Sequence, residues 1–400
     1  MTNNVPLPSV TLKKRRALPF YNRHPWVFAG AIANVQGEPE PGSEVRLLAS
    51  DGTFIARGLF NPVSNIRVRL YSWDDSDLSD DLWSQRIDES IALRKRLFPG
   101  DWSKLACRLI YSEADGLSGL TVDWYGGWLM IQLTSRALSE RMDVLLDLLK
   151  RKLTPNGIWL RTEKGMRESE GLELQDGLLD GDDPPRPLFV EENGVQFGVD
   201  VTSGQKTGFF SDQRDNRAAV AKYVEGHRVL DLFCYTGAFG ITAAKAGAKE
   251  VVGVDVSQPA LAMAESNAEL NEVRNQMRFE CSDAFKMLER LAEAGEKFDT
   301  VILDPPKMSR HRSGLKKALR GYHRLNTMAL DVLQSDGLLV TCSCSGLVDR
   351  PLFEEMLSNV AVESNRRLQV LESRGQAADH PVSPQCLENA YLKCYILRCC

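Results

Sequence analysis

The chain has 400 residues, of which 43% are hydrophobic and 26% charged, and its net charge is −5. This composition excludes disordered and fibrous proteins, and the length predicts two or three globular domains instead of one core. The overall negative charge argues mildly against a nucleic-acid-binding protein, although local basic clusters can still bind phosphates.

Targeting segments, disulfides and metal sites are not indicated by the sequence. No apolar run approaches the roughly 18 residues of a membrane span, and residues 1–9 are polar and lack the apolar stretch of a secretory signal. Nine cysteines without disulfide spacing fit a reducing compartment, so we expect a cytoplasmic protein. The pairs Cys342/Cys344 and Cys399/Cys400 lack matching histidines, so we expect no structural zinc.

Two small domains are predicted before residue 188. Residues 11–72 contain short alternating apolar runs separated by glycines, which predicts a small all-β unit followed by an acidic linker at 74–77. An α+β block follows and ends in the Gly/Pro-rich stretch 180–187. Its predicted strands are 107–111, 120–123, 128–133 and 157–161, and its predicted helices are 79–98 and 139–152.

From residue 188 onward, apolar strands alternate with helices, which predicts a parallel, doubly wound sheet of the α/β class. The final two strands are expected to form a hairpin at one end of this sheet. The predicted strands are 228–233, 250–255, 277–280, 300–304, 337–342, 367–372 and 391–398, and the helices are 238–246, 259–271 and 321–333. The predicted domains are therefore 1–74, 75–187 and 188–400.

Four acids recur at or just beyond the ends of these strands: Asp231, Asp255, Asp283 and Asp304. A glycine-bearing turn after Asp231 leads into a helix, and such a turn lets the backbone and the helix N-terminus approach a nucleotide. The turn has neither G-x-G-x-x-G nor a P-loop pattern, which disfavours a dinucleotide oxidoreductase and excludes a P-loop enzyme. Asp255 is placed for ribose hydroxyls and Asp283 for adenine.

Two basic clusters are candidates for phosphate binding. Residues 307–324 contain many lysines and arginines but no acid, and they begin beside Asp304. The second cluster, residues 13–16, is explained equally well as a solvated face. The predicted RNA-binding residues are Lys13, Lys14, Arg15, Lys206, Arg310, Arg312, Lys316, Lys317 and Arg320.

Six motifs spread over nearly the whole chain resemble those of one family, the large-subunit ribosomal RNA cytosine-5 methyltransferase I family. This family belongs to the class I S-adenosylmethionine-dependent methyltransferases. The resemblance implies an N-terminal PUA domain, a central α+β domain, a Rossmann-like methyltransferase domain, S-adenosylmethionine as cofactor, large-subunit ribosomal RNA as partner and a homodimer. The motifs are RHPWVF (23–28), EADGLSGLTVD (113–123), GQKTGFF (204–210), DQRDNR (212–217), TCSCSG (341–346) and QAADHPV (376–382).

The resemblance places the catalytic nucleophile at Cys344. Carbon 5 of cytosine is a poor nucleophile until a thiolate adds to carbon 6, so the reaction needs a reactive cysteine. Asp304 would hold the base edge, and Lys307 would help to stabilise the thiolate. We expect the strands that end at Asp304 and Cys342 to be adjacent, with Cys342 itself buried in its strand. The predicted cofactor-binding residues are Phe210, Gln213, Asp231, Phe233, Tyr235, Thr236, Gly237, Asp255, Val256, Ser257, Asp283, Ala284 and Asp304.

Several alternatives remain at this point. The main alternative is methylation of a base nitrogen, such as guanine N2 or N7. Amino methylation usually goes with an Asn/Asp-Pro-Pro-aromatic motif, and both Lys307 at the aromatic position and the presence of Cys344 count against it. A catalytically inactive RNA-binding protein is disfavoured by the intact acids and thiol. His380 is either a structural residue or part of the active-site mouth, and residues 205–210 form either a flap over the cofactor or a packing hairpin. Cys107, Cys281 and Cys394 are expected to be core residues.

Overall fold

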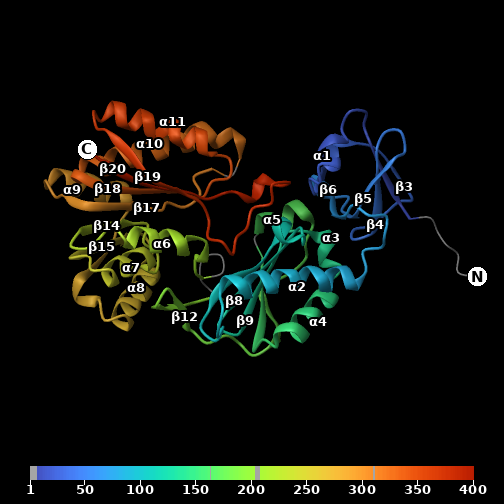
Figure 1. Cartoon of the computed structure of the whole chain (residues 1–400), viewed down its shortest axis with the longest axis horizontal. Helices are drawn as coiled ribbons and strands as arrows, with labels where there is room; N and C mark the ends of the chain where they lie inside the picture. Colours follow the sequence, from blue (N-terminus) through green and yellow to red (C-terminus); the bar gives the residue numbers. More distant parts are fainter. Residues whose placement is uncertain (1–6, 163, 203–207, 310) are drawn as a thin grey trace, which may run out of the picture. The chain divides into compact units, whose positions relative to one another are not determined.

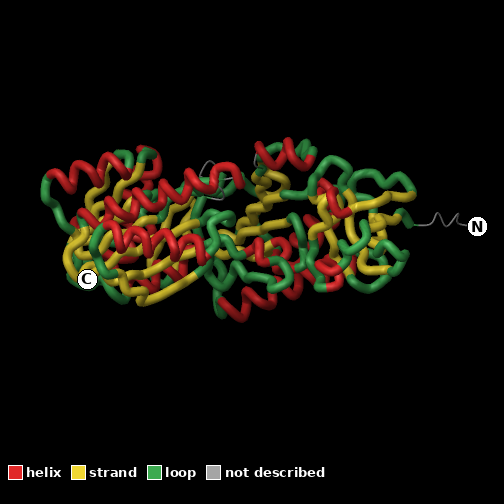
Figure 2. The backbone as a smooth tube through the Cα atoms, turned by 90° about the horizontal axis from the view of Figure 1, so that it is seen from above, coloured by secondary structure: helices red, strands yellow, loops and turns green. Residues whose placement is uncertain are grey.

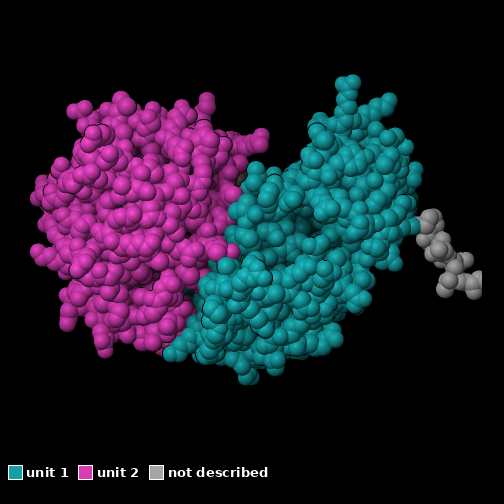
Figure 3. Space-filling model, in the orientation of Figure 1, with its two compact units in different colours: residues 1–185, 200–209, 379–389 teal, residues 186–199, 210–378, 390–400 magenta. Residues whose placement is uncertain are grey.

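The computed structural model describes residues 7–162, 164–202, 208–309 and 311–400. The chain forms two compact units (Figure 3) and passes between them several times. Lys206 and Arg310, both predicted to bind RNA, lie outside the described residues. The division into three domains stays a prediction. Unit 1 comprises Met1–Pro185, Asp200–Phe209 and Asp379–Asn389, and unit 2 comprises Arg186–Val199, Phe210–Ala378 and Ala390–Cys400.

The N-terminal part of unit 1 is a six-stranded sheet with the order β2-β6-β5-β4-β1-β3. Strands β1 and β4 alternate between buried and half-buried side chains, β5 and β6 are buried along most of their length, and Val10, Leu47, Ile55 and Val68 belong to the core. The all-β unit predicted for residues 11–72 is therefore confirmed, with one short helix added. The elements are β1 (Ser9–Leu12), α1 (Leu18–Tyr21), β2 (Trp26–Phe28), β3 (Ile32–Gln36), β4 (Glu44–Leu48), β5 (Phe54–Phe60) and β6 (Ile66–Ser72).

The second part of unit 1 is a five-stranded sheet with the order β11-β10-β9-β8-β7, against which α2 and α4 pack. Trp83 and Ile87 of α2 and Leu145 and Leu149 of α4 share one apolar cluster with the strands. Both predicted helices are present. The elements are α2 (Asp80–Leu97), β7 (Ala106–Tyr111), β8 (Leu120–Tyr125), β9 (Trp128–Leu133), α3 (Arg136–Ser139), α4 (Met142–Leu153), β10 (Gly157–Arg161), α5 (Lys164–Glu170) and β11 (Gly177–Gly181).

Unit 2 is built on a seven-stranded sheet with the order β16-β15-β14-β17-β18-β20-β19. The strands from β16 to β18 are parallel, whereas β20 runs antiparallel to both β18 and β19. The predicted doubly wound sheet and its terminal hairpin are thereby confirmed. The strands are β14 (Arg228–Leu232), β15 (Glu250–Asp255), β16 (Met277–Cys281), β17 (Phe298–Leu303), β18 (Leu333–Ser343), β19 (Leu368–Arg374) and β20 (Lys393–Cys399), and β12 (Leu188–Glu192) pairs separately with β13 (Val195–Val199).

Helices cover both faces of this sheet (Figures 1 and 2). Met287 of α9, Leu325 of α10 and Phe353 of α11 pack on one face, in a cluster that includes Leu230 and Leu232 of β14. Helices α7 and α8 contact β15 from the other face, as the alternation of side chains along a strand requires. The helices are α6 (Arg214–Ala221), α7 (Ala238–Lys245), α8 (Gln258–Leu270), α9 (Ala284–Glu293), α10 (Leu315–Asp331) and α11 (Arg350–Glu363).

The helix predicted at 321–333 is wrong at its start, because α10 begins at Leu315. Leucine, lysine, alanine and arginine favour helix at residues 315–320, and this preference outweighs the cost of about 1 kcal/mol for Gly321 inside the helix. A Cβ atom at Gly321 would lie 3.0 Å from Met308 Sδ, so the glycine permits close packing there. Within the described residues, no helix combines the length and apolar character required to cross a membrane.

Candidate cofactor and thiol site

A strained turn follows β14 in unit 2. The backbone φ angle is positive at Phe233 (63°), Tyr235 (51°) and Gly237 (83°), the last of which precedes α7. Positive φ is unfavourable for residues other than glycine, so surrounding contacts must hold the turn. One such contact joins Asp231 Oδ2, which accepts a hydrogen bond of 2.9 Å, to the backbone N–H of Gly240. A Cβ atom at Gly240 would lie 3.1 Å from that oxygen, so a larger residue would force the carboxyl group to shift by a few tenths of an ångström.

Burial dominates the protonation of Asp231, which is 1% exposed. It raises the pKa of Asp231 to about 8, while the hydrogen bond from Gly240 opposes the shift and the charges of Asp304 and Asp255 add to it. The carboxyl group is therefore mostly protonated at neutral pH. Asp231 therefore supports the turn as a neutral acid, and the negative charge near the turn comes from Asp255 and Asp304.

Asp255 holds the turn from the adjacent strand. Its Oδ2 accepts the backbone N–H of Tyr235, and its Oδ1 accepts the N–H of Ser257, each at 2.9 Å. Each carboxylate oxygen can accept a second hydrogen bond, so the half-buried group retains capacity for a hydroxyl. Val256 is 69% exposed, and the Phe210 ring lies edge-on to Tyr235 with centroids 5.5 Å apart. Apolar and acidic groups thus adjoin one another at this strand end.

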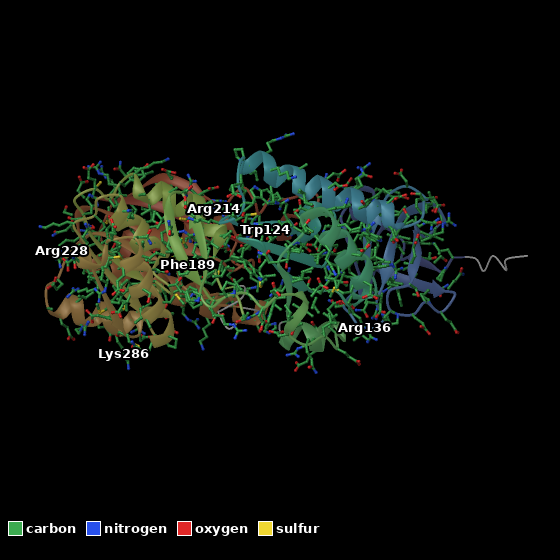
Figure 4. All side chains as sticks on the ribbon, turned by 90° about the horizontal axis from the view of Figure 1, so that it is seen from below. Trp124, Arg136, Phe189, Arg214, Arg228 and Lys286 are labelled. Atoms are coloured by element: carbon green, nitrogen blue, oxygen red, sulfur yellow. The ribbon has the colours of Figure 1, made fainter. Side chains whose placement is uncertain are left out.

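Three further predicted residues contribute to the turn or to the start of helix α9. Asp283 is exposed and caps α9, because its Oδ1 accepts the N–H groups of Phe285 (3.0 Å) and Lys286 (3.1 Å; labelled in Figure 4). Ala284, buried, begins this helix. The buried Thr236 accepts a hydrogen bond of 3.3 Å at its carbonyl oxygen from Asn267 Nδ2.

Asp304 follows β17 and is held by a chain of amide groups. Gln213 Nε2 donates to Asp304 Oδ1 at 2.9 Å, and Gln213 Oε1 accepts from Asn216 Nδ2 at 2.6 Å. Arg374 Nε then donates to Asn216 Oδ1 at 3.0 Å. Gln213 and Asn216 are both buried, so the network fixes the carboxylate orientation. Sequence reasoning identified Gln213 but missed Asn216 and Arg374, whose partners are distant in the chain.

The two cysteines at the end of β18 differ sharply. Cys342 is fully buried opposite Cys394, as predicted, and its pKa is raised well above the usual range by that thiol and by burial. Cys344 follows the strand, is half-buried, and its Sγ lies 3.9 Å from the carbonyl oxygen of Pro305. Strands β17 and β18 pair directly, as predicted, which brings Cys344 to the Asp304 loop.

The prediction that Cys281 is a core residue is wrong. Cys281 is exposed because it ends β16, the outermost strand at one edge of the sheet. Cys107 and Cys394 are buried, which confirms that part of the prediction.

A buried lysine beside Cys344 was not identified from the sequence. Lys393 begins β20, pairs with Ser343 across the strands and is only 3% exposed. Its Nζ donates to the carbonyl oxygens of Ser345 (2.6 Å) and Tyr391 (2.7 Å). A charged residue within a run of otherwise apolar strand residues was the available signal. The predicted Lys307, by contrast, is exposed.

Most of the remaining predicted residues are exposed, whereas His380 is buried. Residues 13–15 are exposed in unit 1, and Lys13 Nζ donates to Gly30 O at 2.9 Å. His380 is buried in unit 1, 3.0 Å from Asp379 Oδ1, which favours its structural interpretation. The predicted basic residues of unit 2 that the structure describes are all exposed, namely Arg312, Lys316, Lys317 and Arg320.

One cluster of metal-ligand types occurs among the described residues, and it lies in unit 1. Ligand atoms of His24, Cys386 and Glu388 lie within 4.8 Å of one another. However, His24 Nδ1 accepts the Trp26 N–H at 3.2 Å, which leaves Nε2 as the protonated nitrogen facing Glu388. A metal on Nε2 would require the opposite tautomer, so this geometry does not fit an ion.

Comparison with known proteins places these features in a class and then in a family. Residues 10–73 match the PUA-like domain, and residues 111–385 match the S-adenosylmethionine-dependent methyltransferase family. The parallel sheet with its glycine turn is therefore that of an S-adenosylmethionine-dependent methyltransferase. The chain belongs, within this class, to the ribosomal RNA large subunit methyltransferase I family.

Relatives of that name match over nearly the whole chain. The protein from Photobacterium profundum is 42% identical over 395 residues, which covers 97% of this chain and 99% of the relative. The protein from Erwinia tasmaniensis is 40% identical over 394 residues, covering 97% and 98%. Among solved structures, a methyltransferase from Streptococcus mutans has the same fold, with a TM-score of 0.84, 19% identity and coverage of 98% and 99%. The methyltransferase SMU.776, complexed with SAH, gives a TM-score of 0.85 at 19% identity, covering 98% and 99%.

Proposed function

We propose that this protein methylates carbon 5 of a cytosine in large-subunit ribosomal RNA, with Cys344 as the nucleophile. The relatives' names supply the RNA class. The single observation that carries the choice of atom is the half-buried thiol of Cys344, 3.9 Å from the Pro305 carbonyl oxygen. A methyltransferase that modifies a base nitrogen needs no thiol at this position.

The residues of unit 2 fit a bound S-adenosylmethionine. The remaining hydrogen-bonding capacity of Asp255 suits ribose hydroxyls, and the exposed Val256 offers an apolar surface for adenine. Gly237 has a positive φ of 83° and immediately precedes α7, which would bring backbone N–H groups close to the ligand. Phe233, Tyr235, Thr236, Gly237, Ser257, Asp283, Ala284, Phe210 and Gln213 would complete the cofactor site.

In the proposed reaction, the bound cofactor supplies an electrophilic methyl group. Cys344 Sγ, as a thiolate, forms a bond to carbon 6 of cytosine, and the electron pair of the 5,6 double bond becomes available at carbon 5. Asp304, oriented by Gln213, would act in its protonated form, donating a hydrogen bond to N3 and so stabilising the negative charge that develops there. Once the methyl group is on carbon 5 and S-adenosylhomocysteine is left behind, the C5 proton would pass to water, the N3 proton would return to Asp304, and the S–C6 bond would break, which restores both the double bond and the thiolate.

Exposed basic groups would bind the RNA backbone. Arg312 and the α10 residues Lys316, Lys317 and Arg320 lie on the segment that follows Asp304. The predicted cluster Lys13, Lys14 and Arg15 belongs to the PUA-like domain and would add phosphate contacts there. Lys307 would contact phosphate or the thiolate. A cytoplasmic location and a homodimer stay predictions.

The proposal is tested by methyl transfer from tritiated S-adenosylmethionine to ribosomal RNA, followed by nucleoside analysis. We expect label in 5-methylcytidine, and we expect Cys344→Ala to reduce the rate by at least about a thousandfold because covalent activation is lost. Cys342→Ala is the matched control and should retain turnover, since its buried thiol does not reach the reactants. Label in a methylguanosine, or normal turnover by Cys344→Ala, would contradict the proposal.

A further inference from the structure

The thiol of Cys344 has a buried cationic neighbour on the adjacent strand. Ser343, which precedes Cys344, is paired across the sheet with Lys393, and Ser345, which follows it, accepts a hydrogen bond of 2.6 Å from Lys393 Nζ. Lys393 therefore contacts the backbone on both sides of Cys344, at Ser343 through strand pairing and at Ser345 through its amine. The proximity is also electrostatic, because the charge of Cys344 raises the pKa of Lys393.

Two carbonyl groups fix the position of the amine. Lys393 Nζ donates to Ser345 O at 2.6 Å and to Tyr391 O at 2.7 Å. A neutral amine has two N–H bonds, which these carbonyls use, and a lone pair that can take one more proton. Lys393 is therefore anchored in either protonation state, and the proton released by a thiol has an acceptor that is already in place.

We infer that Lys393 is a positioning residue that holds the Cys344 thiol in its reactive thiolate form. The proton of the Cys344 S–H bond passes to Lys393 Nζ, so the pair changes from thiol and amine to thiolate and ammonium without a change in net charge. When the S–C6 bond breaks at the end of the reaction, the thiolate is restored beside the same ammonium. This inference rests on the proposed nucleophilic role of Cys344.

Burial makes this lysine responsive near neutral pH. It lowers the pKa of Lys393 to about 8, and Cys344 opposes that shift. The other charged groups that influence Lys393 come from two neighbouring segments: Arg350 and Lys307 lower its pKa, and Asp349 raises it. Lys307 follows β17, whereas Asp349 caps α11 and Arg350 is the first residue of that helix. Among these groups Lys393 is the buried cation, and burial strengthens its interaction with a nearby thiolate.

The inference is tested by the rate at which iodoacetamide alkylates Cys344 without RNA, measured at each cysteine by mass spectrometry from pH 6 to 10. In the wild-type protein we expect half-maximal reactivity of Cys344 below about 8.5, the ordinary thiol value. Lys393→Met should shift the profile upward and slow alkylation at pH 7 by at least about tenfold. Lys393→Arg, which keeps the charge, should stay within about threefold of wild type.

Internal controls come from the other cysteines. The exposed Cys281 should react equally in every variant, and the buried Cys342 should remain unreactive unless the protein unfolds. Lys245→Met, at an exposed lysine of α7, should leave the Cys344 profile unchanged. If the Lys393→Met variant does not fold, the inference is still tested by the pH midpoint of Cys344 alkylation in the wild-type protein and in Lys393→Arg.

An unchanged Cys344 profile in folded Lys393→Met, or a wild-type midpoint above about 8.5, would overturn the inference. Because alkylation requires no RNA, this outcome is separate from a failure of cytosine methylation. A low midpoint in an enzyme that methylates guanine would keep the pairing and refute the proposed reaction instead.

Discussion

Asp231 is a buried acid in which burial and hydrogen bonding oppose each other. Its folded pKa of about 8 lies above the value of an unfolded chain, near 4. Between these values the folded state alone keeps the proton, so stability is greatest at low pH and falls as pH rises. The slope from this one group reaches about 1.4 kcal/mol per pH unit. Asp231 therefore contributes less to the free energy of unfolding at neutral pH than at pH 4.

Asp231→Asn should remove this pH dependence. The asparagine Oδ1 can still accept the Gly240 N–H, while the side chain cannot ionise. We expect the melting temperature of the variant, relative to wild type, to rise progressively from pH 5 to pH 8, as measured by differential scanning fluorimetry. Asp283→Asn, at an exposed acid, is the matched control and should not change the pH slope. Parallel curves for Asp231→Asn and wild type would show that Asp231 does not titrate in this range.

At the scale of elements, helix α10 carries several basic side chains and follows the loop that begins at Asp304. Lys316 and Lys317 are exposed, whereas Ala318 and Tyr322 pack into the core. Charge can therefore be removed from this helix without disturbing its buried face, particularly by glutamine, which has similar helix propensity.

The double substitution Lys316→Gln/Lys317→Gln should weaken RNA binding and reduce its dependence on salt. Each lost phosphate contact lowers the slope of log K against log salt by roughly 0.7 for single-stranded RNA. The slope is measured by filter binding of ribosomal RNA fragments at salt concentrations from about 50 to about 300 mM. Lys245→Gln/Lys249→Gln removes equal charge near the amino end of β15 and should leave the slope unchanged. Equal slopes for the two double variants would argue against α10 as an RNA-binding element.

The helices and strands also differ in how well the sequence predicted them. Apolar strands such as β14 and β17 were predicted within one or two residues, because continuous apolar runs between turns have few other solutions. The adjacency of Asp304 and Cys344 followed from the rules of parallel sheets. The start of α10 was not predicted correctly, because a glycine and several charged residues obscured the helical pattern of the sequence there. Lys393 was missed because its significance depends on the pairing of β18 with β20, which local sequence does not specify.

At the scale of the whole molecule, the two units exchange segments of chain. Residues 379–389 belong to unit 1, although the segments before and after them belong to unit 2. Within unit 1 this segment is anchored by buried polar contacts. Asp379 Oδ2 accepts the backbone N–H of Arg108 at 2.9 Å, and its carbonyl oxygen accepts from Arg94 Nη2 at 2.8 Å. Tyr111 donates to the carbonyl oxygen of Asn389 at 2.9 Å.

A fragment of residues 186–400 should therefore fail to fold independently, even though it contains the entire seven-stranded sheet. It would leave Asp379, which is fully buried in the intact chain, without its partners from residues 94–111, and each lost hydrogen bond removes about 0.5–1.5 kcal/mol of net stabilisation. We expect the fragment alone to aggregate or to bind S-adenosylhomocysteine at least about tenfold more weakly than the full chain, by isothermal titration calorimetry. Co-expression with residues 1–185 should restore a soluble complex with near-normal affinity, because the anchoring contacts can then form. A monodisperse 186–400 fragment with full affinity would show instead that the sheet and its turn suffice for cofactor binding.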